Sequence, residues 1–218
     1  MCIRDRDDWS MPGKVYAAVL PDDLSGFDEE HQLSLQVIRE NMLKNHGYYK
    51  VTEDGVEQCL ISCDDGVYRF TPPESEEQDW TVEKLVDEAA SDAVLVDLDQ
   101  DGEKELILIS PFHGEHIYFY KKIDGDYKKV YTYDTADFAH AIYGGTLLGK
   151  PAVIIGHRKG ERNLLLFTWE QEKGQYQVEI LDRDCGPANV FKYERGTEEV
   201  LISTNREIDE VAMYTFEK

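Results

Sequence analysis

The segment 96–108, VDLDQDGEKELIL, places several possible metal ligands close together. Asp97, Asp99 and Asp101 alternate, a glycine follows, and an apolar run begins soon after it. Carboxylates at this spacing suit Ca²⁺, which takes six to eight oxygen ligands, and the glycine permits the sharp bend of such a loop. The alternative is a metal-free turn held by Asx-type hydrogen bonds. An EF-hand is excluded, because its twelfth position needs an acidic residue and here holds Leu108.

A second set of residues could do chemistry through imidazole and guanidinium groups. Five of the six histidines and several arginines fall in a few short polar segments of an otherwise acidic chain. Converging imidazoles could hold a transition metal such as Zn²⁺ and leave a position open for a ligand. Alternatively, a neutral histidine could act as a general base beside cations that hold an anionic or enolate-like intermediate. The candidates for catalysis are His46, His140, His157 and Arg158, and the candidates for a ligand-binding face are His113, His116, Arg162, Asn205 and Arg206.

These residues lie within a repeat of short apolar strands. The blocks CLIS, ILIS, VIIG and VLIS begin at residues 59, 107, 153 and 200, so their spacings are 48, 46 and 47 residues. Each block follows one strand and precedes one or two more, with turn residues between them. Alternation within the strands suits half-buried antiparallel sheet, and helical periodicity is nearly absent. One unit is therefore four short strands in about 47 residues.

A four-stranded unit of this length, repeated head to tail, predicts an all-β fold, a β-propeller with antiparallel blades. The alternative is a β-sandwich with coincidental spacing. About 4.5 blades are present, so we expect an N-terminally truncated propeller in which residues 1–13, which begin MCIRDR, are an artefact or disordered leader. We expect residues 33–45 to form a strand and a connector. The single domain is expected over residues 14–218, with a partial blade at 14–40, blades at 45–88, 91–135 and 139–184, and an incomplete last blade at 187–217.

The strand order of a blade sorts its loops onto two faces. Loops that lead into the first strands share a face with loops that join the second and third strands, and propeller ligand sites usually lie on this face. We expect His46 and His140, which hold equivalent positions in two blades, to point near the central axis, and the acidic loop to lie on the opposite face. The plainer interpretation is that the other histidines are solvated or bonded to nearby carbonyls, and that Arg162 and Arg206 pair with surface carboxylates.

The acidic loop resembles the loop of FG-GAP/VCBS-type propellers, a repeat also found in integrin α-chains. Its residues fit the pattern D-x-D-x-D-G-x-x-[DE]-L. The turns at 52–58, 146–152 and 193–199 keep the glycine but lose the aspartates, apart from Asp54 in the first of them. The resemblance implies a structural Ca²⁺ that pins the edge of a blade. Its ligands would be Asp97, Asp99, Asp101 and Glu105, with the carbonyl of Glu103 in addition.

A shorter stretch is similar to another group of propellers. The phrase HAIYGG at 140–145, followed by VIIGHRKG at 153–160, resembles a stretch of FG-GAP-type sugar lyases, the aldos-2-ulose dehydratase group. Those enzymes dehydrate keto-sugars with the help of a metal. The resemblance nominates His140, His157 and Arg158 as site residues.

Charge and cysteine usage limit the classes of partner. A formal charge of −22 disfavours nucleic acid and anionic membrane surfaces as partners, and no apolar run approaches the roughly 20 residues of a membrane helix. Cys59 and Cys63 would lie about 13 Å apart on one strand, too far for a disulfide. Reduced core cysteines favour the cytoplasm, although the location stays open.

Two functions fit this sequence. The first is a binding module that recognises a small carbohydrate or a protein through the histidine- and arginine-rich face, with calcium as a structural ion. The second is an enzyme, a metal-assisted sugar lyase or isomerase with its site at the mouth of the central channel. The sequence contains no Gly-rich phosphate-binding loop, no G-x-S-x-G and no H-E-x-x-H, so hydride transfer, phosphoryl transfer and serine-type hydrolysis have no support.

Overall fold

The structure is a computed structural model that describes residues 10–75 and 77–217, and it confirms an all-β fold. Five antiparallel sheets follow one another along the chain, and three of them have the four strands expected of a complete blade. The strands are β1 (Gly13–Ala17), β2 (Gln36–Met42), β3 (Tyr48–Glu53), β4 (Val56–Cys63), β5 (Gly66–Thr71), β6 (Thr81–Val86), β7 (Asp92–Val96), β8 (Glu105–Ile109), β9 (Ile117–Ile123), β10 (Asp126–Tyr133), β11 (Ala139–Leu147), β12 (Lys150–His157), β13 (Leu164–Glu170), β14 (Gln175–Asp182), β15 (Pro187–Arg195), β16 (Glu198–Asn205) and β17 (Glu210–Glu217).

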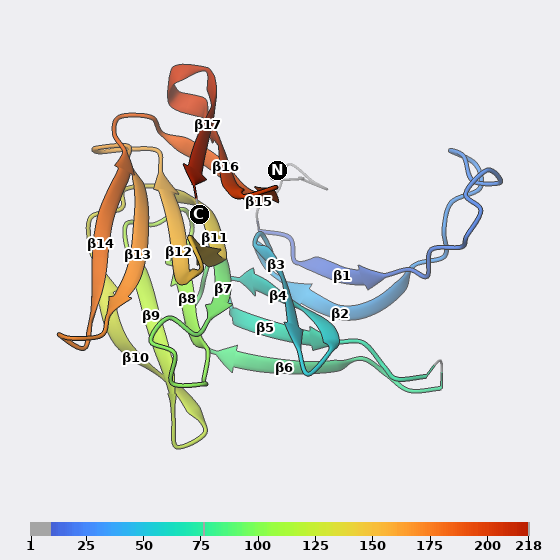
Figure 1. Cartoon of the computed structure of the whole chain (residues 1–218). Coiled ribbons are helices and arrows are strands. Elements are labelled where there is room, and N and C mark those ends of the chain that lie inside the picture. The colour runs from blue at the N-terminus through green and yellow to red at the C-terminus, as the bar shows by residue number, and fades with distance from the viewer. Residues whose placement is uncertain (1–9, 76, 218) are drawn as a thin grey trace.

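The sheets are arranged as blades of a propeller. Strands β3–β6, β7–β10 and β11–β14 form four-stranded blades, and β15–β17 form a fourth blade of three strands. The first strand of each blade lies toward the centre, with β7 beside both β3 and β11, and β11 beside β15 (Figure 1). The outer strands β6, β10 and β14 lie at the periphery (Figure 1). A propeller was predicted because one unit repeated, and the same strand order recurs in every complete blade.

The hydrophobic core lies between the blades rather than inside any one of them. Each blade interface has its own apolar cluster, because both faces of an interior sheet are covered. The cluster between β7–β10 and β11–β14 contains Phe119 and Phe167, with Tyr131 and Tyr176 packed against them. Their ring centroids lie about 5 Å apart, at aromatic stacking and edge-to-face distances. The tyrosine-rich strands therefore serve packing between blades.

The N-terminal part forms a separate two-stranded sheet, β1–β2. The expected strand at 33–45 is present as β2, and Met42 at its end is buried in a cluster with Cys63 and Phe70. This sheet thus packs on the β3–β6 blade. Most of the proposed leader, residues 1–9, lies outside the described residues, and β1 begins at Gly13.

The described residues contain one turn of 3₁₀ helix, η1 (Arg206–Ile208), and no helix of sufficient length and hydrophobicity to cross a membrane. Cys59, Cys63 and Cys185 are free thiols, as the strand spacing predicted for the first two. Cys2 lies outside the part of the chain that is described.

Candidate functional site

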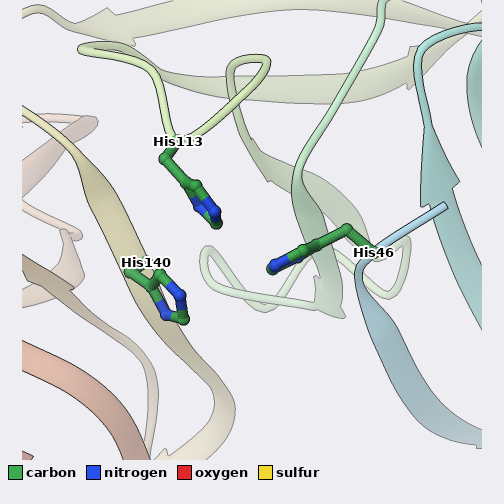
Figure 2. A group of neighbouring side chains, drawn as sticks. All are labelled: His46, His113 and His140. Carbon is green, nitrogen blue, oxygen red and sulfur yellow. The ribbon is translucent and has the colours of Figure 1, made fainter. Parts of the chain in front are cut away.

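Three histidines from three consecutive blades converge near the propeller axis. His46 precedes β3, His113 lies in the loop between β8 and β9, and His140 lies in β11. Their side chains point toward one another (Figure 2), and one ring nitrogen from each lies within 4.8 Å of the others. The ring centroids of His46 lie 4.7 Å from His113 and 5.7 Å from His140. We call His46, His113 and His140 the three-histidine centre.

His46 reaches the centre because the chain beside it passes very close to the next blade. Its Nδ1 lies 3.1 Å from the carbonyl oxygen of Ser91, at the start of the β7–β10 blade. A Cβ on the following residue, Gly47, would lie 2.7 Å from that same oxygen and 2.5 Å from Cα of Asp92. Only glycine permits this approach. A neutral His46 that donates from Nδ1 to the carbonyl presents Nε2 as its remaining acceptor.

His113 is held in an uncommon backbone conformation. Its φ is +54°, a left-handed value that few residues other than glycine adopt. Its backbone N–H donates to Ser91 Oγ at 2.7 Å, and the N–H of Gly114 donates to the carbonyl of Ser110 at 3.0 Å. Within the described residues, Nδ1 of His113 is buried and has no hydrogen-bond partner. A buried ring nitrogen without a partner is what a metal ion or ligand could satisfy.

His140 is aimed at the centre by an irregularity in its strand. The register between β11 and β12 shifts between Ala139 and Ala141, so His140 lies at a bulge. Bulges re-aim side chains and are common beside functional sites. Nδ1 of His140 lies 2.7 Å from the carbonyl oxygen of Ala188, at the start of the next blade. His46 and His140 thus share one arrangement, in which each ring is oriented by a backbone carbonyl of the following blade.

Burial keeps these imidazoles uncharged. Burial, with a smaller contribution from the other histidines and from Arg158, lowers the pKa of His113 to about 3. The pKa of His140 is lowered to about 4, also chiefly by burial, and that of His46 is lowered for the same reason. Neutral imidazole is the form that binds metals. The set therefore offers three nitrogen donors without protons to displace near neutral pH.

Aromatic rings and one arginine border the centre. Phe112 lies edge-on to His46 with ring centroids 5.3 Å apart, and Phe138 stacks on His113 at 4.8 Å. The guanidinium of Arg158 lies 4.9 Å from the Phe138 ring centroid, at cation–π distance, and pairs with Glu207 through Nε and a terminal nitrogen at 2.8 and 2.7 Å. Arg158 is thus fixed beside the centre, and its charge is balanced by Glu207.

A pocket of about 580 Å³ adjoins the centre and shares His113 with it. This volume lies within the range of small-molecule sites. Phe138 lines the pocket, as do Ser110, Pro111, His113 and Gly114 from the segment that follows β8. The lining side chains that can hydrogen-bond are Glu88, Ser110, His113, Glu115, His116, Tyr118, Asp137 and Lys159.

The remaining histidine candidates have other surroundings. His116 lines the pocket, with Nδ1 3.1 Å from the carboxylate of Asp134, and stacks on Tyr118 at 5.8 Å. His157 is buried, and both of its ring nitrogens are engaged. Nδ1 lies 2.9 Å from the carbonyl of Lys159, while Nε2 accepts the backbone N–H of Asn163 at 3.1 Å. His157 therefore holds its own hairpin together and is not brought into the three-histidine centre.

The other expected ligand-binding residues are spread along the last two blades. Arg162 pairs with Asp184, as the plainer interpretation expected. Asn205 is buried, where its amide nitrogen donates to Glu210 at 2.8 Å and its oxygen accepts from Ser203 at 2.6 Å. Arg206 is exposed in η1. The structure does not bring these three side chains together with the histidines.

The acidic loop lies at the other end of β8 from His113. Oxygens of Asp97, Asp99 and Glu105 lie within 4.8 Å of one another. Asp97 Oδ2 accepts the N–H of Gly102 at 3.2 Å, while its Oδ1 is buried with no partner in the described part of the chain. Burial raises the pKa of Glu105 to about 7. Three of the five expected calcium ligands are therefore assembled.

A lysine reaches into this acidic group. Nζ of Lys121, from β9, bonds Asp99 and lies 3.0 Å from Asp101 and 3.7 Å from Glu105. Asp101 is thus at the rim of the group, facing the lysine. Glu103, whose carbonyl was the expected ligand atom, donates its N–H to Asp101 Oδ1 at 2.9 Å, and its side chain is not part of the carboxylate group. The ammonium group supplies positive charge where a bound cation would.

The sequence did not indicate that His113 would join His46 and His140. His113 was assigned to a broader ligand-binding face, because nothing in SPFHGEH signals a left-handed histidine. Ser91 and the two phenylalanines were not anticipated. A shared position in two blades did indicate that His46 and His140 would approach one another.

Comparison with known proteins identifies a fold. No protein family matches the chain, and no curated protein does. Among solved structures, the chain is similar to a "putative 6-phosphogluconolactonase" from Bacteroides fragilis NCTC 9343, with a TM-score of 0.51 and 13% sequence identity. The likeness covers 87% of this chain and 63% of that one, so the chain spans less than two thirds of that protein's length. At this identity the likeness shows the fold alone.

Proposed function

We propose that this chain is a ligand-binding propeller module whose site is a divalent transition-metal centre, formed by His46, His113 and His140. The observation that carries the proposal is the approach of three neutral imidazoles from three blades to within 4.8 Å. Two of them are oriented by backbone carbonyls through Nδ1, the usual outer-shell arrangement of metal-binding histidines. Three nitrogen donors suit Zn²⁺ and leave a fourth position for an oxygen of the ligand.

The adjoining pocket favours a small carbohydrate as the ligand. Phe138 offers an apolar ring face, and three carboxylates with Lys159 and His116 offer acceptors and donors for hydroxyl groups. The excess of carboxylates in the pocket and the charge of −22 disfavour an anion. A neutral polyhydroxylated molecule fits both the pocket and the open metal position. A protein ligand is the other partner that the sequence allowed.

The second candidate function is a metal-assisted sugar lyase or isomerase at the same place. Arg158 favours it, because this cation lies close enough to contribute to the low pKa of His113 and His140. A fixed cation beside a metal could stabilise an enolate-like intermediate. His116, whose Nδ1 lies 3.1 Å from the carboxylate of Asp134, is a candidate base that lines the pocket.

In either case we propose that the acidic loop is a structural Ca²⁺ site, as its resemblance to FG-GAP/VCBS-type loops implied. Support comes from the assembled oxygens of Asp97, Asp99 and Glu105 and from the unpartnered Oδ1 of Asp97. Calcium would replace Lys121 as the local positive charge. The loop would then stabilise a blade edge and take no part in ligand binding.

Metal content and zinc affinity test the proposal. The wild-type protein is expected to bind one Zn²⁺ that the double variant His46→Ala/His140→Ala does not bind. The matched control is His31→Ala, which removes an exposed histidine that pairs with Asp28 and does not belong to the three-histidine centre. Equal zinc binding by the double variant and the control would overturn the proposal. Incubation of the zinc-loaded protein with neutral sugars then separates a module, which binds without product, from an enzyme.

A further inference from the structure

We propose that Ser91 is the positioning residue of the three-histidine centre, fixing two of its three members at once. The inference rests on the proposed function of that centre. Ser91 lies immediately before β7, on the blade between those that supply His46 and His140. Its carbonyl oxygen lies 3.1 Å from Nδ1 of His46, and its Oγ accepts the backbone N–H of His113 at 2.7 Å.

The Ser91 hydroxyl is itself fixed. Ser91 is 1% exposed, and its Oγ–H donates to the carbonyl of Ser110 at 3.1 Å while its own N–H donates to Ile109 at 3.0 Å. The proton therefore points at Ser110, and a lone pair of Oγ faces the N–H of His113. This single side chain joins the start of β7 to both ends of the peptide segment Ser110–His113.

His113 needs such an acceptor more than an ordinary loop residue does. Its left-handed backbone is intrinsically unfavourable for a residue with a Cβ, and persists only where the surroundings impose it. The hydrogen bond from its N–H to Ser91 Oγ is the contact that ties this residue to the β7 segment. Loss of that acceptor would let the backbone at His113 relax and swing its imidazole away from His140, 4.6 Å distant.

His140 is positioned independently of Ser91, because its Nδ1 faces the carbonyl of Ala188. Substitution of Ser91 is thus expected to disturb the centre selectively. The His46 contact uses the backbone of residue 91 and survives a change of side chain, so the effect of removing Oγ should pass through His113 alone.

The test compares Ser91→Ala with Ser62→Ala. Ser62 is also 1% exposed, and its Oγ has no hydrogen-bond partner among the described residues. Its backbone pairs with His46 and Gly47, so Ser62→Ala removes a buried hydroxyl beside the centre without removing a hydrogen bond to it. We expect Ser91→Ala to weaken Zn²⁺ and Co²⁺ binding about 10- to 100-fold, the usual effect of losing an outer-shell contact. The visible absorption of bound Co²⁺ should change as well. Ser62→Ala and the hydroxyl-retaining Ser91→Thr should bind like wild type.

A double-mutant cycle shows whether Ser91 acts through His113. In a His113→Ala background, Ser91→Ala should cost no further metal affinity, whereas a general structural role would cost the same in both backgrounds. Thermal unfolding without metal shows whether Ser91→Ala is folded. If it is not folded, Ser91→Cys takes its place in the cycle. Wild-type affinity and an unchanged Co²⁺ spectrum for the Ser91 variant would overturn the inference. Absence of Zn²⁺ and Co²⁺ binding by the wild-type protein would instead overturn the proposed function.

Discussion

The imidazoles of His113 and His140 lie nearly parallel, with ring centroids 4.6 Å apart and planes 15° apart, although they come from adjacent blades. Two imidazolium cations at this separation would repel one another strongly in a buried setting. Burial lowers the pKa of both rings, and repulsion among the histidines adds to this effect, so both are neutral near pH 7. Neutral imidazoles are suitable metal ligands. Because the rings stay neutral only in the folded state, they also make the free energy of unfolding depend on pH.

The metal-free protein should lose stability as the pH falls below 6.5. Above that pH the histidines are neutral in both states and contribute nothing. Between pH 6.5 and the folded-state pKa values of about 3 and 4, the imidazoles of His113 and His140 bind protons in the unfolded chain but not in the folded chain. The free energy of unfolding should fall by at most about 1.4 kcal/mol per pH unit for each histidine. Urea unfolding in EDTA at pH 7 and pH 5 measures this change in the free energy of unfolding. The change should be smaller in the variant His113→Gln/His140→Gln. An equal change in the variant and the wild-type protein would contradict this prediction.

Asp92 should have the opposite dependence on pH. Burial raises its pKa from 3.8 to about 7, so between these values the folded state holds a proton that the unfolded state releases. The contribution of the Asp92 carboxyl to the free energy of unfolding is fully present below pH 3.8 and is lost as the pH rises through 7. Asp92→Asn keeps an acceptor for the N–H of Ala93, 2.9 Å away, and should stabilise the protein by about 1–2 kcal/mol at pH 8 and by less at pH 5. Asp126→Asn, at an exposed turn, serves as the control, and a gain for Asp92→Asn that does not vary with pH would contradict this assignment.

Gly47→Ala should destabilise the protein and weaken zinc binding together. The new methyl group would overlap Cα of Asp92 and the carbonyl of Ser91, which is backbone that cannot move without shifting β7. The expected cost is about 1–3 kcal/mol in chemical unfolding. Gly26→Ala is the control, since a Cβ there meets nothing within 4 Å and its φ is not positive. Equal stability of the two variants would show that the blades do not approach as closely as described.

Lys121→Met tests the acidic loop. Removal of the ammonium group leaves Asp99 and the buried Glu105 without their cation, so the protein should lose roughly 1–3 kcal/mol in EDTA. Added Ca²⁺ should restore the free energy of unfolding of the variant. It should also bind the variant more tightly than the wild-type protein, because it no longer competes with Lys121. Lys128→Met, whose ammonium lies 3.3 Å from the exposed Asp126, should change neither property. A variant that calcium fails to stabilise would remove the case for a calcium site.

The fold was predictable because it follows from local patterns that repeat. Four apolar blocks at nearly equal spacing indicated the blades, and their apolar residues lie in β4, β8, β12 and β16 as expected. His46 and His140 hold equivalent positions at the first strands of two blades. Because first strands lie near the axis, these positions also indicated that the two side chains would lie close together.

The composition of the site was less predictable, because it depends on contacts between blades. The left-handed backbone of His113 and the bulge at His140 arise from bonds to other blades or strands, to which no short motif corresponds. His157 lies in the stretch that resembles the sugar lyases, yet both of its ring nitrogens form hydrogen bonds within its own hairpin. Lys121 follows the aspartates by about 20 residues, and only the pairing of β8 with β9 brings it to them.

The most direct measurement is the position of zinc in a crystal of the wild-type protein. Crystals grown in EDTA and then soaked in Zn²⁺ would be measured at the zinc absorption edge. We expect an anomalous peak about 2.0–2.1 Å from one nitrogen each of His46, His113 and His140. Zinc found only on surface carboxylates, with the three imidazoles unliganded, would contradict it.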